Sequence, residues 1–189
     1  MLVGSSAGGV QGLGTLLGGL DPELPVPVLV AQHLRRSRET RIVSVLSRST
    51  SLTIRLAEDR ERPRAGTVYI APPDHHLCVC PDGVLELTDE RPVNFARPAA
   101  DPLFESAGRA YGGRIIACVL TGADSDGARG VTAVRGRGGT VIVQDPETAE
   151  FHGMPKAAIE TGQVDFVRGL EDIAPTINHL LRETRPAGP

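Results

Sequence analysis

The sequence predicts an α/β protein with a doubly wound, mainly parallel sheet of the Rossmann-like, three-layer kind, into which an antiparallel hairpin is inserted. Three observations carry this prediction. Short apolar runs rich in β-branched residues recur along the chain, segments with helical periodicity lie between them, and one segment near the middle breaks the alternation. Alternating strands and helices fold into a parallel sheet with helices on both faces.

Buried parallel strands are predicted where apolar residues follow one another without interruption, which is typical of strands covered on both faces. The predicted strands cover residues 1–3, 26–32, 52–56, 67–71, 114–121 and 140–144. The strands at 52–56 and 67–71 carry the weaker pattern. Residues 76–87 differ, because two alternating stretches flank Asp82-Gly83, and this pattern predicts the antiparallel hairpin.

Helices are predicted where apolar residues recur every three or four positions. The stripes are Val10, Leu13, Leu16, Leu17 and Leu20; Ile42, Val45 and Leu46; Leu103, Phe104, Ala107 and Tyr111; and Leu170, Ile173, Ile177, Leu180 and Leu181. Asp101 followed by Pro102 is typical of an N-cap and a first helical turn. We expect one domain over residues 1–182 and a flexible tail over residues 183–189.

The composition excludes several classes of function. A formal charge of −3 and a pI of about 6.0 do not suggest binding to nucleic acid or to an anionic membrane. No apolar run approaches the roughly 20 residues needed for membrane insertion, and no signal peptide is recognisable. Three cysteines do not make a disulfide framework. We therefore expect a cytoplasmic protein.

The first predicted strand is followed by Gly-Ser-Ser-Ala-Gly-Gly at residues 4–9, which fits G-x-S-x-G centred on Ser6. Glycines on either side let the backbone turn sharply and expose the serine hydroxyl, and the amides of the next helix could stabilise an oxyanion. A glycine-rich turn without chemistry is the alternative. A dinucleotide site is disfavoured, because Ser6 replaces the second glycine of G-x-G-x-x-G and the second strand ends in Gln32-His33 without an acidic residue.

Two further strand ends carry residues that a serine nucleophile needs. His33 follows the second strand, whose carboxyl end should lie beside that of the first, and it could act as the general base. Asp124 and Asp126 follow the strand at 114–121. One of them could orient His33, and one could instead cap the next helix. The local pattern leaves the choice between the two carboxylates open.

Other polar clusters are interpreted more simply. The cluster of His75, His76, Cys78 and Cys80 lacks a second ligand pair at zinc-site spacing, so we expect no metal. Arginines follow His33, and we interpret them as a solvated helix face, with guidance of an acidic substrate as the alternative. These arginines are Arg35, Arg36, Arg38 and Arg41.

The motifs together resemble the catalytic domain of the chemotaxis protein-glutamate methylesterases, the CheB family. The matching blocks are Gly4 to Gly9, Gln32-His33, Ala71-Pro72-Pro73-Asp74, Asn94 with Arg97-Pro98, Asp101 to Phe104, Leu120-Thr121-Gly122 with Asp126-Gly127, and Gly153 to Lys156. The resemblance covers nearly the whole chain and keeps the family order. It implies hydrolysis of glutamate methyl esters on methylated chemoreceptors or receptor-like proteins, and deamidation of receptor glutamines in some members.

The resemblance also assigns roles to residues of this chain. It implies Ser6 as nucleophile, His33 as base and Asp126 as the orienting acid. Backbone amides near Ala7 or Ala123 would hold the oxyanion, and no cofactor is implied. Ala7 stands where the family often has Thr, and Ala123 where it often has Met.

The family's usual phospho-acceptor domain is not found before the first predicted strand of the given sequence, so we expect no phosphorylation control in cis. The chain could be a stand-alone paralogue, an excised fragment or one piece of a signalling complex, with a separate regulatory protein as a candidate partner. Two other functions stay open. One is a stand-alone esterase or amidase of the same scaffold with another substrate. The other is a non-catalytic module that docks on receptors.

Overall fold

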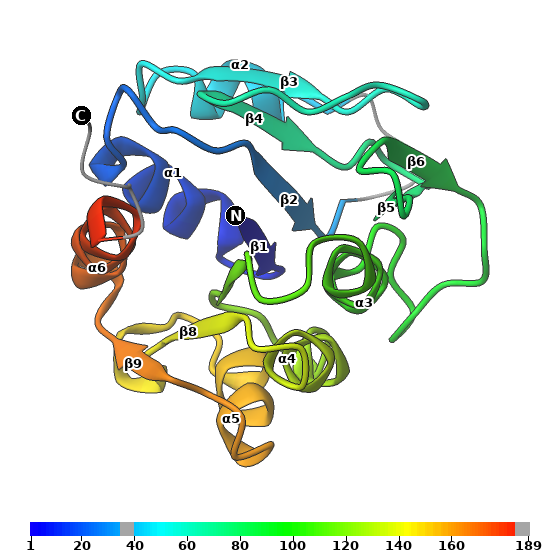
Figure 1. Cartoon of the computed structure of the whole chain (residues 1–189). Coiled ribbons are helices and arrows are strands. Elements are labelled where there is room, and N and C mark those ends of the chain that lie inside the picture. Colours follow the sequence, from blue (N-terminus) through cyan, green and yellow to red (C-terminus); the bar gives the residue numbers. More distant parts are fainter. Residues whose placement is uncertain (35–39, 184–189) are drawn as a thin grey trace.

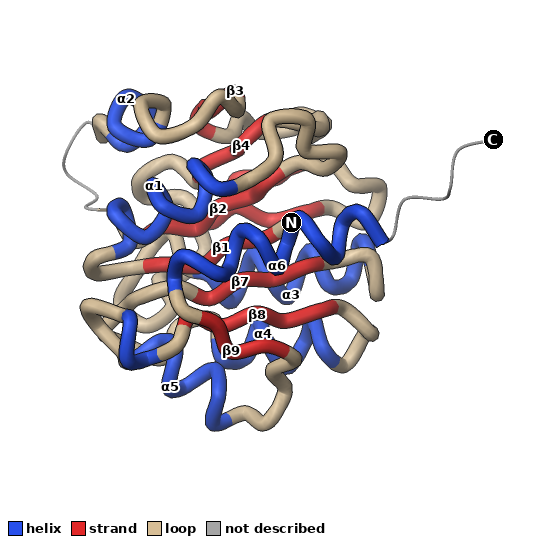
Figure 2. Tube along the Cα trace, turned by 90° about the vertical axis from the view of Figure 1, so that its left-hand side faces the viewer, coloured by secondary structure: helices blue, strands red, loops and turns tan. Residues whose placement is uncertain are grey.

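The chain folds into three layers, with a parallel sheet between two layers of helices (Figures 1 and 2). The structure is a computed structural model, and it describes residues 1–34 and 40–183. The strands are β1 (Leu2–Ser5), β2 (Val28–Gln32), β3 (Thr53–Leu56), β4 (Thr67–Ile70), β5 (His76–Val79), β6 (Leu85–Thr88), β7 (Ile116–Val119), β8 (Thr140–Gln144) and β9 (Phe166–Arg168). The helices are α1 (Gly9–Gly19), α2 (Ile42–Leu46), α3 (Ala100–Tyr111), α4 (Ala128–Arg135), η1 (Pro146–Thr148), α5 (Gly153–Glu160) and α6 (Leu170–Glu183).

The main sheet has the order β3-β4-β2-β1-β7-β8-β9, and all neighbouring strands are parallel. The chain builds one half of the sheet outward from β1 and then returns to β7 on the other side of β1. The strand order therefore reverses between β1 and β7. In doubly wound sheets, ligands bind beyond the carboxyl ends of the strands at such a reversal. This confirms the predicted fold class and places the expected site beyond β1 and β7.

Alternate residues of each central strand pack into two separate cores. Leu2, Leu29 and Ala117 face α3, α4, α5 and the hairpin. Val3, Val30 and Cys118 face α1, α2 and α6. Figure 2 shows α6 in front of the sheet and α3 behind it. Because both faces are covered, the strands are continuous apolar runs, as the sequence indicated.

The predicted hairpin is confirmed as β5 paired antiparallel with β6, outside the main sheet. It packs on α3, where the Ser106 hydroxyl accepts a hydrogen bond from the Val79 amide at 3.1 Å. The connection from β6 to α3 then runs back over the carboxyl end of the sheet. No helix among residues 1–34 and 40–183 is both long and apolar enough to cross a membrane.

Several local predictions need correction. The N-cap of α3 is Ala99, not Asp101, and Asp101 lies in the first turn with its carboxylate bonded to the Gly130 amide at 2.8 Å. Val10 and Val45 belong to predicted buried stripes, yet both are exposed. Glu183, expected in the tail, ends α6.

Two expectations fall partly beyond the described chain. Residues 184–189, the rest of the expected tail, lie outside the described residues. So do Arg35, Arg36 and Arg38, whose expected helix face is not described; Arg41, the fourth arginine, is exposed at the start of α2.

His76 makes the stability of the fold depend on pH. Its ring is fully buried, and burial lowers its pKa, although a hydrogen bond to the Arg91 carbonyl acts in the opposite direction. Above the unfolded-state pKa of about 6.5 the ring is neutral in both states and the fold keeps its full stability. As the pH falls below about 6.5 toward the lower folded-state pKa, the unfolded chain takes up a proton that the buried ring does not, so stability is lost.

We therefore expect the urea midpoint of the wild type to fall from pH 7 to pH 5.5 by more than that of His76→Gln. The glutamine amide can still donate to the Arg91 carbonyl but does not titrate. His179→Gln is the matched control at an exposed histidine of α6, and it should follow the wild type. Equal pH dependence in His76→Gln and the wild type would contradict this assignment.

Candidate active site

The three residues singled out by the sequence come together beyond the carboxyl ends of β1, β2 and β7. Ser6 follows β1, His33 follows β2, and Asp126 lies in the connection from β7 to α4. The registers of β1 with β2 and with β7 bring these ends side by side. The site therefore sits at the reversal of strand order, as expected for this architecture.

Ser6, His33 and Asp126 form one continuous chain of hydrogen bonds. The Ser6 Oγ lies 2.9 Å from His33 Nδ1, and His33 Nε2 lies 2.7 Å from Asp126 Oδ2. If Nε2 carries the ring proton and donates it to Asp126, Nδ1 is free to accept the serine proton. This arrangement fits a nucleophile, a base and an orienting carboxylate.

Asp126 is fully buried and is held by the start of α3. Its Oδ1 accepts from the Asp101 amide at 3.0 Å, and its Oδ2 accepts from the Ala100 amide. These first-turn amides have no acceptor within the helix, so the carboxylate supplies one from a distant part of the chain. The positive end of the helix dipole also faces this negative charge. The contact explains why α3 needs no capping side chain of its own.

Asp124 takes a different position. Its Oδ2 lies 3.4 Å from His33 Nδ1, on the side of the ring that faces Ser6, and its side chain is 33% exposed. Its Oδ1 accepts from the Asp126 amide at 2.9 Å and so shapes the loop. The buried carboxylate on the far side of the ring is thus Asp126, which is the geometry expected of the orienting acid.

Gln32, the last residue of β2, ties the backbone of the site together. Its Nε2 donates to the carbonyls of Ser6 at 2.8 Å and His33 at 3.1 Å, while its Oε1 accepts from the Ser5 hydroxyl at 2.7 Å. Gln32 and Ser5 are both buried. Gln32 belongs to a motif shared with the family, but the sequence alone assigns it no role. A long amide at the end of a fully buried strand is the signal that could have indicated one.

Small residues let the loops approach Ser6 closely. A Cβ on Gly122 would lie 3.0 Å from the Ser6 Cβ and would overlap Met154. Gly8 has φ +72°, and a Cβ there would lie 2.7 Å from Glu150 Oε2. Among the described residues, no acceptor bonds the amides of Ala7 and Ala123, which follow Ser6 and Gly122. These two amides are therefore available for a ligand oxygen.

Comparison with known proteins identifies the family of this chain. Residues 1–177 match the family model described as CheB methylesterase. The chain belongs to the CheB methylesterase family.

Individual relatives agree with this membership. A putative protein-glutamate methylesterase/protein-glutamine glutaminase of Leptospira interrogans is 38% identical over 92% of this chain and 90% of its own length. A protein of similar name from Paramagnetospirillum magneticum is 42% identical over 94% of this chain, which spans only 48% of that relative. The crystal structure of the Thermotoga maritima CheB methylesterase catalytic domain has 36% identity and a TM-score of 0.90, covering 95% of this chain and 96% of that one.

In this CheB-family chain, Thr121 links the loops around the nucleophile. Its hydroxyl donates toward the Ala7 and Phe151 carbonyls at 3.0 and 3.1 Å and accepts from the Phe151 amide at 2.9 Å. Its amide donates to Gln144 Oε1 at 2.9 Å, and its carbonyl accepts from the Ser6 amide at 3.0 Å. Thr121 thereby couples the ends of β1, β7 and β8. This linking role of Thr121 was not predicted from the sequence.

The histidine and cysteine cluster lies on β5 and in the residues on either side of it. Within residues 1–34 and 40–183, no three His, Cys, Asp or Glu side chains are placed to hold a metal ion. His76 instead bonds the Arg91 carbonyl at 3.2 Å. Burial raises the pKa of the Cys78 thiol, which makes it less available as a thiolate ligand. These contacts favour a packing role for the cluster.

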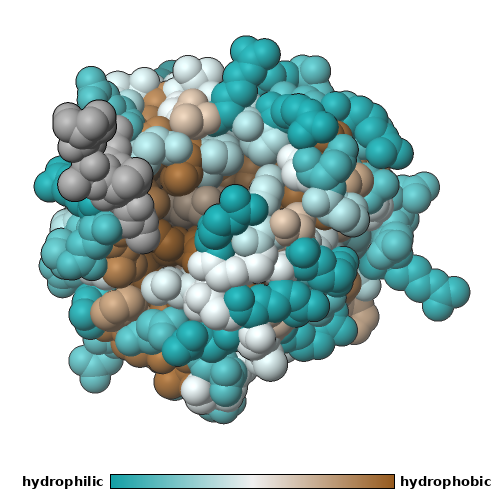
Figure 3. Space-filling model, viewed as in Figure 1, coloured by the Kyte–Doolittle hydropathy of each residue, from teal (hydrophilic) through white to brown (hydrophobic). Residues whose placement is uncertain are grey.

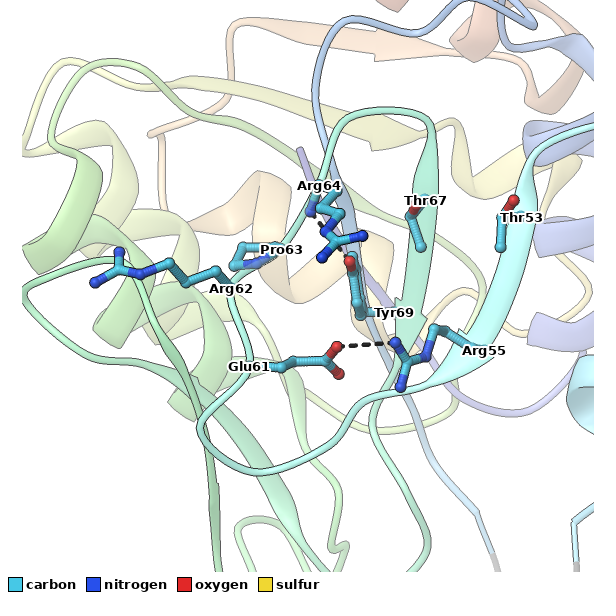
Figure 4. Close-up of a pocket in the computed structure, with 8 residues that line it drawn as sticks. All are labelled: Thr53, Arg55, Glu61, Arg62, Pro63, Arg64, Thr67 and Tyr69. Atoms are coloured by element: carbon cyan, nitrogen blue, oxygen red, sulfur yellow. Dashed lines mark hydrogen bonds and ion pairs between the residues drawn. The ribbon is translucent and has the colours of Figure 1, made fainter.

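A pocket of about 540 Å³ lies elsewhere, against β3, β4 and the loop between them (Figure 4). Arg55 crosses its floor, stacks 5.9 Å from the Tyr69 ring and pairs with Glu61 at 3.0 Å. None of the residues that line this pocket belongs to the Ser6 site. Figure 3 shows one face of the surface, which is mainly hydrophilic around a hydrophobic hollow left of its centre.

Proposed function

We propose that this chain is a serine hydrolase that removes methyl esters from glutamate side chains of methylated chemoreceptors or receptor-like proteins. The observation that carries the proposal is the continuous Ser6, His33 and Asp126 hydrogen-bond chain at the reversal of strand order. Membership of the CheB methylesterase family and the names of the relatives support the same reaction. Deamidation of receptor glutamines by the same residues is part of the proposal.

In the first half of the reaction, the Ser6 hydroxyl attacks the ester carbonyl and its proton passes to His33 Nδ1. His33 Nε2 keeps its proton and donates a hydrogen bond to Asp126. The Asp126 carboxylate stabilises the imidazolium without taking the proton. The amides of Ala7 and Ala123 hold the oxyanion that forms on the carbonyl oxygen. The C–O bond to the methoxy group then breaks, and methanol leaves with the proton from Nδ1.

In the second half, His33 Nδ1 accepts a proton from water as the water oxygen attacks the acyl-serine. The bond to Ser6 breaks, the serine recovers its proton, and a glutamate side chain is released. With a glutamine substrate, ammonia leaves in place of methanol. The steps use only side chains and amides of this chain, so neither cofactor nor metal takes part. The proposed location is the cytoplasm, since the three unpaired cysteines suit a reducing compartment.

The decisive measurement is methanol release from the cytoplasmic fragment of a chemoreceptor whose glutamates have been methylated. We expect release by the native protein, none by heat-denatured protein, and covalent labelling of Ser6 by a fluorophosphonate. Labelling together with hydrolysis of small esters but not of the receptor would indicate an esterase with another substrate. Binding of the receptor with neither labelling nor release would indicate a docking module.

A further inference from the structure

The connection from β6 to α3 contains a tight turn with an unusual residue at its tip. Val93 and Ala96 pair as an antiparallel bridge, with N–H to O distances of 3.0 and 2.9 Å in the two directions. The two residues between them, Asn94 and Phe95, have φ values of +48° and +62°. A two-residue hairpin loop with positive φ at both positions is a type I′ turn.

Phe95 occupies a turn position at which phenylalanine is disfavoured. Type I′ turns favour Asn-Gly, because a side chain at positive φ crowds the backbone while glycine has no Cβ to do so. Phe95 gains nothing in return from packing, since its relative exposure is 103%. A residue that is strained and contributes no buried area to the fold indicates a function for the side chain outside the fold.

The segment that presents Phe95 is firmly attached to the sheet. The Arg97 guanidinium bonds Asp74 Oδ1 through Nε at 3.0 Å and through Nη2 at 2.8 Å, and it also donates to the carbonyls of Asp89 and Glu90. The buried His76 ring bonds the Arg91 carbonyl at 3.2 Å. Hydrogen bonds therefore brace the chain on both sides of the turn that carries Phe95.

A short segment joins the turn to the proposed active site. Phe95 lies five residues before Ala100, and the Ala100 amide donates to Asp126. The Cα of Phe95 is therefore at most about 18 Å from the Cα of Ala100. Two other exposed hydrophobic residues emerge from the same end of the sheet: Val10 from the first turn of α1 after Ser6, and Phe151 from the loop bonded to Thr121. Exposed apolar side chains therefore extend from three segments that are bonded to, or continuous with, the polar site.

We propose that Phe95 is a specificity-determining anchor that inserts between apolar side chains of the protein substrate, beside the glutamate ester presented to Ser6. The inference rests on the proposed function. A protein surface that presents its glutamate ester to Ser6 is large enough to cover the turn as well. Aromatic anchors that fill a pocket on the partner contribute much of the binding energy at protein interfaces.

The test uses binding and catalysis together. In a Ser6→Ala background, which prevents turnover, adding Phe95→Gly should weaken binding of the methylated receptor fragment by about tenfold. With Ser6 intact, Phe95→Gly should raise KM for that fragment by a similar factor and change kcat less than twofold. The same variant gives the turn the favoured Asn-Gly pair and should raise the urea midpoint. If Phe95 served only to stabilise the fold, Phe95→Gly would instead lower the urea midpoint.

Three further variants and measurements complete the experiment. Phe95→Leu should restore most of the affinity, because it keeps an apolar side chain. Val167→Ala changes an exposed valine of β9 and should bind as the wild type does. The fluorophosphonate labelling rate of Ser6 shows whether the reacting residues remain intact. Light scattering shows whether Phe95 joins two copies of this chain.

The outcomes separate the inference from the function on which it rests. Unchanged binding and KM in Phe95→Gly, with methanol still released, would overturn the anchor and leave the methylesterase proposal standing. A dimer that is lost in Phe95→Gly while receptor binding is unchanged would likewise overturn it. Both proposals fail if the wild type releases no methanol and the receptor fragment binds neither Ser6→Ala nor the double variant Ser6→Ala with Phe95→Gly.

Discussion

Replacing Ser6 with alanine is expected to lower methanol release from the methylated receptor fragment by about 10⁶-fold in kcat, because no other hydroxyl is placed against His33 Nδ1 among the described residues. The remaining rate would come from the free amides of Ala7 and Ala123 and from substrate binding. The substitution removes one half-buried oxygen, so the fold should be retained. Methanol release over hours, at substrate concentrations above KM, measures this loss.

Ser5→Ala is the matched control at the neighbouring serine. Ser5 is fully buried, and its hydroxyl donates to Gln32 Oε1 at 2.7 Å, away from His33. Its removal leaves that buried oxygen without a donor and should lower the free energy of unfolding by about 1–3 kcal/mol. The turnover of the folded fraction should stay within about tenfold of wild type. Equal losses of turnover in the two variants would contradict the assignment of Ser6.

The parallel sheet was predictable because its strands are buried on both faces. Uninterrupted apolar runs identified β2, β7 and β8. The structure keeps the predicted bounds of β8 and shortens β2 at its start and β7 at both ends. The strand β9 was missed because it has three residues, lies at the edge of the sheet and is largely exposed. An edge strand of this kind buries too little apolar surface to leave a pattern in the sequence.

The site was predictable where topology alone positions residues. The carboxyl ends of neighbouring parallel strands must meet, so Ser6 and His33 were expected to lie together. The prediction of Asp101 as the N-cap of α3 was wrong for a physical reason. The amides at the start of α3 donate to Asp126, whose carboxylate lies in the connection from β7 to α4. Local sequence cannot reveal a cap supplied from elsewhere in the chain. The linking roles of Gln32 and Thr121 depend on similar long-range contacts.

The choice between Asp124 and Asp126 is testable by two isosteric substitutions. Asp126→Asn is expected to lower kcat by about 10⁴-fold, since an amide near His33 Nε2 removes the negative charge that stabilises the imidazolium and favours the wrong tautomer. The new carboxamide would also offer one acceptor oxygen where the amides of Ala100 and Asp101 now use two. The variant should therefore also unfold at lower urea, and turnover must be measured per folded molecule.

Asp124→Asn is the control on the other side of the ring. The substituted side chain keeps an Oδ1 that can accept from the Asp126 amide, so the loop should hold its shape. At 3.4 Å from Nδ1 and 33% exposed, the Asp124 charge is partly screened by water, and its loss should lower kcat by no more than about tenfold. A 10⁴-fold loss in both variants would mean that the summed charge of the loop, and not the buried carboxylate, makes His33 a base. A loss confined to Asp126→Asn would instead identify burial and the start of α3 as what distinguishes two carboxylates that are only two residues apart.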